Sequence, residues 1–295
     1  MVRFRSPPKA IHSNWKGGRV QRIVLLSIAC VLLTVLSLPG CRSSGNTIVT
    51  FTDPNLEAAI REALNKPSES IYASELAALA SLSAANRGIE NLSGLQYCTN
   101  LTSLDLGFNQ ISDVSPLADL TNLTNLVLEF NQKIADISAL ANLTSLETLD
   151  LDSNQISDVS SLVNLTRLTR LFMYANQITD ISPLAGLTNL TWLYLHTNKI
   201  DDISPLANLI NLTELYLDSN QIGDISSLAN LTSLTTLRLG YNQIENADPL
   251  VQNEGLGLGD GVWLDGNPLS SDSVNTYIPQ LEARGVYVSY QNSGS

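Results

Sequence analysis

The chain has 295 residues, of which 44% are hydrophobic and 15% are charged, and its net charge at neutral pH is −12. The charges are unevenly distributed: the first 40 residues hold six basic residues and no acidic one, whereas the remainder holds 28 acidic residues against 10 basic ones. A body this acidic repels the phosphates of nucleic acid, so nucleic acid is excluded as a partner.

The first 40 residues have the pattern of an export signal. After the basic residues, positions 23–38 form a largely apolar run of 16 residues. A helix that spans a membrane needs about 20 apolar residues, so this run suits a cleaved signal peptide over residues 1–40 better than a permanent span. An uncleaved membrane anchor remains the alternative, and either arrangement exports the body of the protein.

The signal ends in the sequence Leu38-Pro39-Gly40-Cys41. This sequence resembles the lipoprotein box of bacterial lipoproteins, in which a small residue precedes a cysteine. The resemblance implies that the Cys41 thiol receives a diacylglycerol and anchors the protein to the bacterial membrane, facing outside the cytoplasm. Residues 41–47 are then the lipidated cysteine and a short polar tether. Cys98 takes a position that leucine holds in other repeats, so we expect a buried thiol and no disulfide.

Residues 48–78 are expected to form a helical cap at the N-terminal end of the body. A short strand is expected at 48–52, and Asp53-Pro54 then supplies an N-cap residue and a first-turn proline. Apolar residues at helical spacing extend this helix to about residue 65, and a second short helix begins at Ser74. Such helices cover the leucines of the first coil, which would otherwise be exposed to water.

The body from residue 79 to residue 269 consists of copies of one pattern. The pattern is L-x-x-L-x-L-x-x-N-x-I followed by D-I-S-P-L-A-x-L, and it recurs about every 22 residues. Self-similarity at this period indicates a solenoid, in which each coil buries its leucines against its neighbours. We count eight recognisable coils and an irregular ninth. The asparagine of the pattern recurs at Asn109, Asn131, Asn154, Asn176, Asn198, Asn220, Asn242 and Asn267.

Each coil is expected to contain a strand, an asparagine rung and a convex turn. Leucines alternate with outward residues at a period of two around Tyr194, so this segment forms a strand that pairs in parallel with its neighbours. An inward asparagine such as Asn198 bonds the backbone of its own and adjacent coils, which makes a ladder along the array. A single 3₁₀ turn at Pro205 follows on the convex side, and so short a turn predicts modest curvature. The third coil carries one extra residue near Lys133, which is expected to bulge without shifting the strands. The first coil has Asn86-Arg87-Gly88 in place of the asparagine, so its turn is expected to differ.

Residues 270–295 are expected to form a C-terminal cap. The glycine-rich segment 255–261 lacks the preceding strand and following helix of a phosphate loop, so it is interpreted as a loose connection into the ninth coil. Positions 270–284 predict a helix that Pro279 kinks or splits, and 286–290 predict a last edge strand.

The repeat pattern and its asparagines resemble those of the internalins, which are leucine-rich repeat proteins with 22-residue repeats, over about residues 48–290. The resemblance implies an α/β repeat solenoid: a right-handed horseshoe or arc with a concave parallel β-sheet, short 3₁₀ turns on the convex side and a helical cap at each end. It also implies a surface-displayed binding module. The ligand contacts of the family sit at variable positions, so they do not carry over to this sequence.

Recognition by such a scaffold is expected at the outward strand positions, because packing dictates the inward ones. These positions gather aromatic side chains, although aromatic residues make up only 6% of the chain. Because neighbouring parallel strands lie about 4.8 Å apart, we expect these aromatic residues, Trp263 included, to lie close together. Aromatic residues with polar groups are favoured at interfaces, so we predict a binding surface for a protein or a glycan. The alternative is that exposed strands simply favour aromatic residues. The predicted ligand-binding residues are Phe172, Tyr174, Trp192, Tyr194, His196, Glu214, Tyr216, Asp218, Arg238 and Trp263.

The residue types that catalysis and metal binding require are scarce in the body. His196 is its one histidine, and no nucleophile or oxyanion motif accompanies it, so neither a catalytic residue nor an enzyme is expected. A zinc site needs three or four suitable ligands, so zinc is not expected either, and nothing points to a cofactor. Asp150 and Asp152 with Glu129 could hold a weakly bound calcium ion, although acids on a solvated strand face are the ordinary case.

Two functions are consistent with these patterns. The first is a non-catalytic, monomeric, membrane-anchored protein outside the cytoplasm, which recognises a protein or glycan ligand through its concave face. The second is a structural or assembly component of the cell envelope, which binds a partner of the same cell.

Overall fold

The structure, a computed structural model, describes residues 47–291, which belong to one compact unit. The predicted signal peptide, the lipidation site at Cys41 and most of the tether lie outside the described residues. Within the described residues, no helix is both long enough and apolar enough to cross a membrane.

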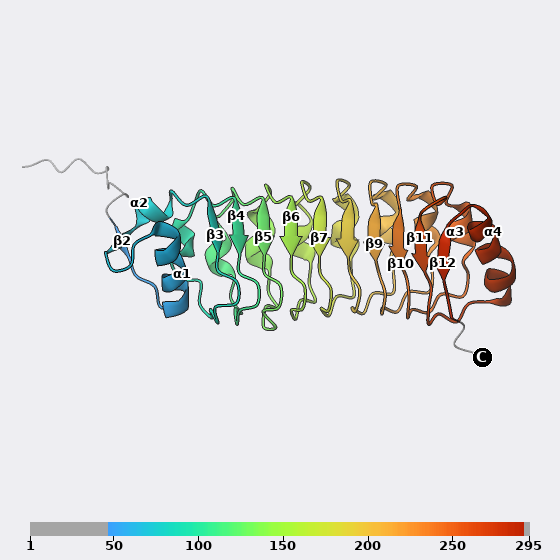
Figure 1. Cartoon of the computed structure of the whole chain (residues 1–295), viewed down its shortest axis with the longest axis horizontal. Helices are drawn as coiled ribbons and strands as arrows, with labels where there is room; N and C mark the ends of the chain where they lie inside the picture. Colours follow the sequence, from blue (N-terminus) through green and yellow to red (C-terminus); the bar gives the residue numbers. More distant parts are fainter. Residues whose placement is uncertain (1–46, 292–295) are drawn as a thin grey trace, which may run out of the picture. The chain divides into compact units, whose positions relative to one another are not determined.

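One parallel sheet runs along the body in chain order, from β3 to β12 (Figure 1). Each of these strands has three residues, and because side chains alternate between the two faces, only the central leucine or valine points inward. The central residue is buried in every strand except β12, where Val288 is half-buried. The central residues are level across the sheet, so Leu193 lies beside Leu171 and Leu215. The strands are β3 Ser81–Ser83, β4 Ser103–Asp105, β5 Asn125–Val127, β6 Thr148–Asp150, β7 Arg170–Phe172, β8 Trp192–Tyr194, β9 Glu214–Tyr216, β10 Thr236–Arg238, β11 Gly261–Trp263 and β12 Tyr287–Ser289.

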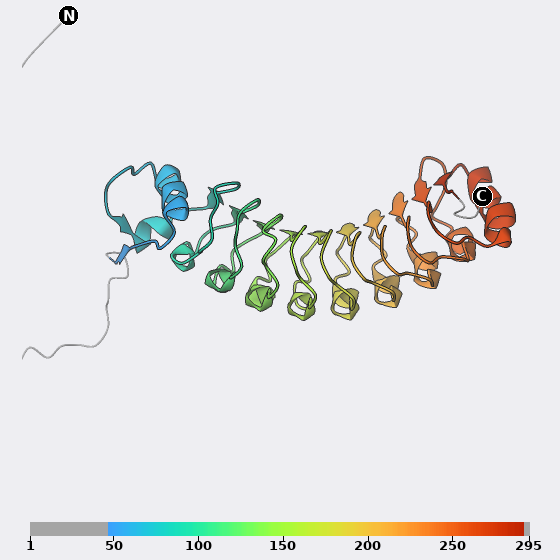
Figure 2. The same ribbon diagram turned by 90° about the horizontal axis from the view of Figure 1, so that it is seen from below.

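Short 3₁₀ turns occupy the other side of each coil, as expected. Figure 2 shows the strands on the inside of a shallow arc and the turns on its outside. An aspartate begins most of these turns: the Asp202 carboxylate accepts a hydrogen bond from the Ser204 N–H at 2.8 Å. The turns are η2 Leu95–Tyr97, η3 Ser115–Leu117, η4 Ser138–Asn142, η5 Ser160–Leu162, η6 Ser182–Gly186, η7 Ser204–Asn208 and η8 Ser226–Asn230, and in the next coil a one-turn helix, α3 Asp248–Gln252, takes their place.

The core is a column of leucines and isoleucines between the sheet and the turns. In the coil that contains β8, Leu193, Leu195 and Leu206 are fully buried, and the equivalent residues of neighbouring coils stack against them. Burying one such side chain contributes about 2 kcal/mol, so the stability of the array comes mainly from this column. Cys98 is also fully buried in the column, as expected, and burial raises the pKa of its thiol to about 12.

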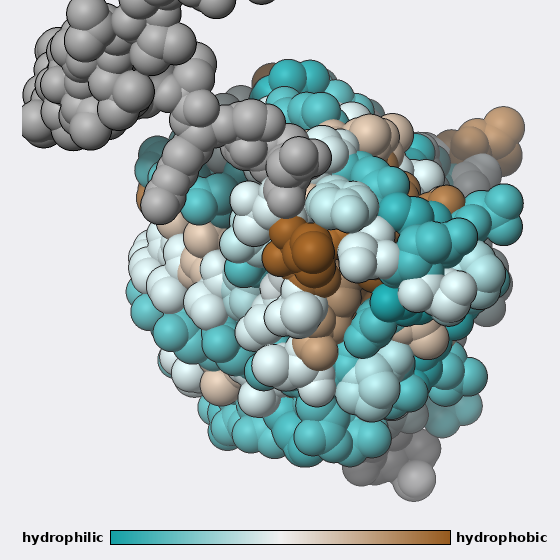
Figure 3. All heavy atoms as spheres, turned by 90° about the vertical axis from the view of Figure 1, so that its left-hand side faces the viewer, coloured by the Kyte–Doolittle hydropathy of each residue, from teal (hydrophilic) through white to brown (hydrophobic). Residues whose placement is uncertain are grey.

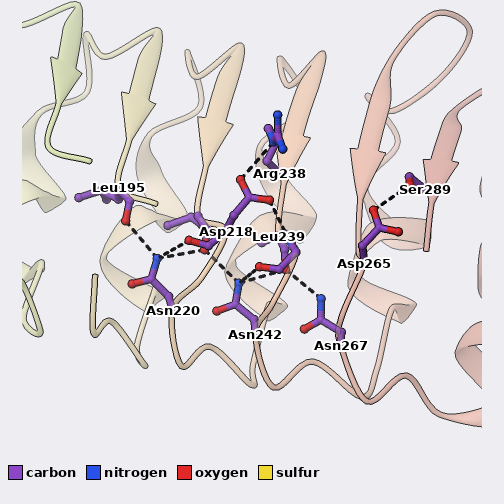
Figure 4. A network of polar contacts seen from close by, with 11 residues as sticks. Leu195, Asp218, Asn220, Arg238, Leu239, Asn242, Asp265, Asn267 and Ser289 are labelled. Carbon is purple, nitrogen blue, oxygen red and sulfur yellow. Dashed lines mark hydrogen bonds and ion pairs between the residues drawn. The ribbon is translucent and has the colours of Figure 1, made fainter. Parts of the chain in front are cut away.

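The predicted asparagine ladder is present, and each rung joins two coils (Figure 4). The Asn220 side chain donates to the carbonyl oxygens of Leu195 and Leu217 at 3.0 Å, and its oxygen accepts from the Ile200 N–H at 3.0 Å. These backbone groups face the core and have no strand partner, and successive asparagines share the carbonyl oxygens, since Asn198 also donates to Leu195 and Asn242 to Leu217. The ladder as a whole therefore satisfies groups that would otherwise be buried without a hydrogen bond.

The extra residue of the third coil breaks one rung of this ladder. Strands β5 and β6 keep the level register of the other pairs, so the insertion bulges without shifting the sheet, as predicted. Ile134 follows its coil's asparagine by three positions instead of two, and its N–H does not bond the next asparagine. The Asn154 side-chain oxygen is consequently buried without a hydrogen-bond partner.

Deleting Lys133 is expected to raise the free energy of unfolding by about 1–2 kcal/mol, because Ile134 then reaches the position that satisfies the Asn154 oxygen. Urea denaturation of the variant and the wild type measures this gain. Deleting Lys199 from a regular coil is the matched control and is expected to destabilise the protein. An unchanged or lower unfolding midpoint for the Lys133 deletion would contradict the account of the rung.

The N-terminal cap is built around Asp53. Its helix, α1 Pro54–Leu64, ends at Asn65 in the left-handed conformation. The Asp53 carboxylate accepts from the N–H groups at the start of this helix and also from two N–H groups of the first coil, those of Glu90 and Asn91. Figure 3 views this end of the unit, where the visible surface is mainly hydrophilic around one small hydrophobic area.

Two further contacts complete this cap. A two-stranded antiparallel sheet joins β1 Ile48–Val49 to β2 Ile71–Tyr72, and the sequence predicted only its first strand. The second short helix is α2 Ala73–Leu76. Arg87 holds the place of the missing asparagine in the first coil, and its guanidinium pairs with Glu62 of α1 at 2.7 Å. The different turn of this coil therefore connects the cap to the array.

The C-terminal cap confirms the expected split of the last helix. A π-helical segment, η9 Ser273–Tyr277, leads into α4 Ile278–Ala283, which has Pro279 in its first turn. Proline lacks an N–H, so the regular hydrogen bonding of an α-helix cannot continue through it. The Arg284 guanidinium donates to the carbonyl oxygens of Val251, Asn253 and Leu256, and so ties the glycine-rich connection to the cap.

Candidate binding surface on the concave sheet

The concave face comprises the outward residues of β3–β12 and, in each coil, the residue that follows the second leucine. All ten predicted binding residues lie on it. Seven are strand residues: Phe172, Trp192, Tyr194, Glu214, Tyr216, Arg238 and Trp263. The other three, Tyr174, His196 and Asp218, occupy the row after the second leucine of their coils.

Six of these side chains form one contact group, which we call the aromatic cluster: Phe172, Tyr174, Trp192, Tyr194, His196 and Tyr216. Tyr194 is at its centre, face to face with Tyr216 at 4.1 Å between ring centroids and edge-on to Phe172 at 4.9 Å. Parallel strands lie about 4.8 Å apart, which is close to a ring-stacking distance, so level aromatic residues on adjacent strands stack. The rings are half-buried by one another and stay partly exposed to solvent.

Charged groups surround the cluster. Arg170 lies over the Trp192 ring at 4.6 Å, and Arg238 lies 5.5 Å from the Tyr216 ring. The Tyr194 hydroxyl donates to the Glu214 carboxylate at 2.6 Å. Burial and this carboxylate raise the pKa of Tyr194, so its hydroxyl stays protonated. These contacts hold the rings in one arrangement and so reduce the entropy that a partner's binding would cost.

Trp263 is separate from the aromatic cluster, contrary to the expectation that it would lie with the other rings. Arg238 occupies the strand between them, 5.7 Å from the Trp263 ring, and forms an ion pair with Asp218 at 3.1 Å (Figure 4). Trp263 packs instead near Tyr287 of the last strand, at 5.8 Å. Each strand contributes one side chain to each row of the concave face, so Arg238 alone separates Tyr216 from Trp263.

His196 is positioned for contact rather than for acid–base chemistry. Its ring stacks on Tyr174 at 4.2 Å, and its Nδ1 is buried without a hydrogen-bond partner. Burial lowers the pKa of His196, and Arg238 lowers it further, against the opposing effect of Asp218. No described serine, threonine or cysteine donates a hydrogen bond to this ring. Among residues 47–291, His196 therefore has no nucleophile partner.

Four carboxylates precede the aromatic cluster on the concave face, and we call them the acidic section: Asp105, Glu129, Asp150 and Asp152. Burial, with repulsion from Glu129 and Asp105, raises the pKa of Asp150 to about 6, although the Asp152 N–H opposes the shift. Burial, with repulsion from Asp150, raises the pKa of Asp152 to about 7. Within residues 47–291 no cluster of three or more histidine, cysteine, aspartate or glutamate side chains is arranged to hold a metal ion.

Replacing Asp152 by asparagine is expected to stabilise the protein by on the order of 2 kcal/mol at pH 8, and by less at pH 5. The pKa of Asp152 is about 7 in the folded state against an ordinary value of 3.8, so folding takes up protons between these pH values. Its contribution to stability is therefore fully present below pH 4 and falls as the pH rises to about 7. Urea denaturation at pH 5 and pH 8 measures this, with Asp201→Asn, an exposed acid outside the sheet, as control. An equal effect at both pH values would contradict it.

The sequence-based prediction missed one group of aromatic residues, because it considered only the strand positions and the row that follows the second leucine. Phe108 and Phe130 lie one position further along, directly before the asparagines, and their rings stack at 4.6 Å. Their spacing of 22 residues was a usable signal, because residues one period apart lie side by side. The acidic section was recognised only as three possible calcium ligands; the partial burial of Asp150 and Asp152 could not be read from the sequence.

Comparison with known proteins agrees with this geometry. The sequence model of the family described as "Leucine Rich repeats (2 copies)" matches residues 78–119, 99–142, 121–164, 144–185, 166–208 and 210–252. Together these segments cover more than half of the chain. Among curated proteins, none matches the chain significantly.

Solved structures with the same arrangement include two internalins of Listeria monocytogenes. Internalin inlF is 37% identical, with a TM-score of 0.75; the match covers 83% of this chain and 72% of that one. Internalin C2 is 44% identical, with a TM-score of 0.66, over 70% of this chain and 91% of that one. A leucine-rich repeat protein of Leptospira interrogans is 25% identical, with a TM-score of 0.53, over 67% and 56% of the two chains.

The stacked coils, with their sheet, asparagine ladder and convex turns, define a solenoid repeat protein. With these matches, the chain belongs to the leucine-rich repeat family and is internalin-like. This fold typically serves protein binding.

Proposed function

We propose that this protein is a non-catalytic binding protein that recognises a partner protein through its concave face, and that a lipid on Cys41 anchors it to the membrane outside the cytoplasm. The observation that carries the proposal is the aromatic cluster. The cluster places six partly exposed rings in contact on the outward, concave face of the sheet, opposite the face that packs on the core. Tyrosine, tryptophan and arginine are the residues that contribute most to protein interfaces.

The packing of the rings supports a protein partner over a glycan. A sugar stacks on the free face of an aromatic ring, whereas Tyr194 and Tyr216 face each other and Tyr174 faces His196. Arg170 lies over Trp192. The groups left for a partner are ring edges, hydroxyls and guanidinium groups, which suit the side chains and backbone of a protein.

The test is capture of partners by the full chain and by a variant in which Trp192, Tyr194 and Tyr216 are all replaced by serine. We expect the variant to lose at least tenfold in affinity, about 1.4 kcal/mol, because rings at the centre of an interface contribute most of its energy. The matched control replaces three exposed apolar residues outside the sheet, Tyr97, Val163 and Ile210, by serine. Equal capture by the folded variant and the control would overturn the proposal.

The source of the captured protein distinguishes the two cellular roles. Capture from the membranes of the producing cell supports a component of envelope assembly, whereas capture from foreign cells supports recognition of another organism. The anchor is tested separately with a palmitate analogue, which should label the wild type and not Cys41→Ala. Equal labelling of the two would exclude lipidation at Cys41.

A further inference from the structure

Two phenylalanines lie at the edge of the concave face, Phe108 exposed and Phe130 half-buried. Phe108 and Phe130 directly follow Gly107 and Glu129, and their rings stack with centroids 4.6 Å apart and planes 7° apart. Half of the Phe108 surface (50%) is open to solvent. We call these two residues the rim pair. Nothing in the core covers them, so burial does not explain why large apolar residues occupy these positions.

The backbone at the rim pair makes phenylalanine a costly choice. Phe108 and Phe130 have φ angles of 57° and 53°, in the left-handed region that favours glycine and asparagine. The same position of the other coils has the same left-handed conformation. It holds small residues in five of them, Ser153, Ala175, Thr197, Ser219 and Gly266, and the larger Asn86 and Tyr241 in the other two. The fold therefore tolerates small residues here, and bulky exposed residues in a disfavoured conformation are a mark of functional positions.

The rim pair directly adjoins the acidic section. The Phe108 N–H bonds the Glu129 carbonyl oxygen at 2.9 Å, and the Phe130 N–H bonds that of Asp152 at 2.8 Å. Gly107 leaves open the space beside the Asp105 and Glu129 side chains, because a Cβ there would lie 3.1 Å from the Glu129 Cγ and 3.5 Å from an Asp105 oxygen. Aromatic rings and carboxylates thus share one edge of the sheet.

The acidic section has no positive partner. Within residues 47–291, none of the ion pairs involves Asp105, Glu129, Asp150 or Asp152. On the other half of the same face, by contrast, Asp218 is paired with Arg238. Mutual repulsion of the four carboxylates contributes to the raised pKa values of Glu129, Asp150 and Asp152. A cation placed among them would relieve this repulsion.

We propose that the rim pair and the acidic section together bind a lysine or arginine side chain of the partner protein. This rests on the proposed function and adds the chemistry of the partner. The cationic head lies among the carboxylates, and the alkyl stem packs against the two rings, which also attract the charge. The partner therefore carries a basic segment beside the part that meets the aromatic cluster.

The probe is a trilysine peptide, and the control probe is the same peptide acetylated at every side-chain amine, which keeps the stems and removes the charge. The full chain, in an uncharged detergent, is labelled with ¹³C in phenylalanine, of which it has only 5. We expect trilysine to shift the ring signals of Phe108 and Phe130 saturably and the acetylated peptide to leave them unchanged. Equal shifts with both peptides, or none with trilysine, would overturn the proposal.

Two double variants assign the binding to these residues. Phe108→Ser with Phe130→Ser installs the residue that other coils use, so the fold is retained, and Asp150→Asn with Asp152→Asn removes charge without changing shape. Each double variant is expected to weaken trilysine binding at least tenfold. Binding is measured by the shift of the Gly107 amide signal, because both variants retain this residue. Asp119→Asn with Asp201→Asn removes the same charge outside the concave face and is expected to leave binding unchanged. If this control weakens binding equally, the attraction comes from net charge alone and the proposal fails.

Failure here is distinguishable from failure of the proposed function. The capture test with the Trp192, Tyr194 and Tyr216 variant does not involve trilysine. If the variant loses capture but trilysine does not bind, the proposed function stands and only the lysine or arginine site is wrong. Conversely, if trilysine binds but the variant captures its partner as well as the wild type, the cation site stands and the role of the aromatic cluster in partner recognition is wrong.

Discussion

Replacing Asn220 by alanine is expected to lower the free energy of unfolding by about 2 kcal/mol. The side chain is 9% exposed, and its oxygen is the acceptor for the Ile200 N–H. Its amide donates to the Leu195 and Leu217 carbonyl oxygens, which also accept from Asn198 and Asn242. Alanine leaves the Ile200 N–H buried without a partner, which costs about 1–3 kcal/mol before the chain relaxes, and it removes one of the two asparagine donors of each carbonyl oxygen. The measurement is urea denaturation followed by circular dichroism.

The broken rung of the ladder provides an internal control for this prediction. Asn154 has the same position and similar burial, 7% exposed, and donates to Leu128 and Leu151 at 3.0 Å, but its oxygen accepts no hydrogen bond. Asn154→Ala is therefore expected to cost about 1 kcal/mol less than Asn220→Ala, because it orphans no N–H group. Equal losses in the two variants would show that the oxygen of the rung contributes nothing.

Replacing Asp53 by alanine is expected to cost about 3 kcal/mol and to detach the N-terminal cap. One carboxylate oxygen accepts from Asn55 and Leu56 at 2.9 and 3.1 Å, and the other accepts from Glu90 and Asn91 at 2.7 and 3.1 Å. The side chain therefore begins α1 and also fastens it to the first coil. Hydrogen exchange of α1 amides is expected to rise more than exchange in the coils around β8.

The Asp53 prediction has a pH dependence and a matched control. Burial favours the neutral carboxyl, but four backbone N–H donors outweigh it and lower the pKa of Asp53 below its ordinary value of 3.8. Its contribution is therefore present above pH 3.8 and is lost as the pH falls through the lower folded value. Asp180→Ala removes a carboxylate that begins an exposed turn, with bonds only to Ser182, and is expected to cost less than 1 kcal/mol. Similar losses in both variants would contradict the role of Asp53 in joining two elements.

The sheet and the aromatic cluster follow almost directly from the period of the sequence. A 22-residue repeat places each residue beside its equivalent in the next coil, so the contact of Tyr194 with Tyr216 can be read as a difference in number. The same rule would have found the rim pair, had the position before each asparagine been included. Helix α1 was equally accessible, because its proline, cap and apolar spacing are local signals.

Features that depend on contacts between different elements were not accessible in this way. Strand β2 has two residues and exists because it pairs with β1 across the N-terminal cap. The second pair of Asp53 bonds needs the fold to bring the first coil to α1. The contacts of the Arg238 side chain with the Asp218 carboxylate and with the Tyr216 and Trp263 rings depend on side-chain packing, which the period does not specify.

The sequence by itself therefore determined the architecture of this protein, the rows of its concave face and the residues within each row. Nearest-neighbour stacking makes all of these a matter of spacing along the chain. Only the tertiary structure decided which of those residues form ion pairs, which are partly buried and which rings are in contact. It set Asp150 and Asp152 in a half-buried group without a cation, and left the Asn154 oxygen unpaired. The physical reason is that side-chain packing and desolvation depend on three-dimensional neighbours, whereas the repeat specifies only where the backbone lies.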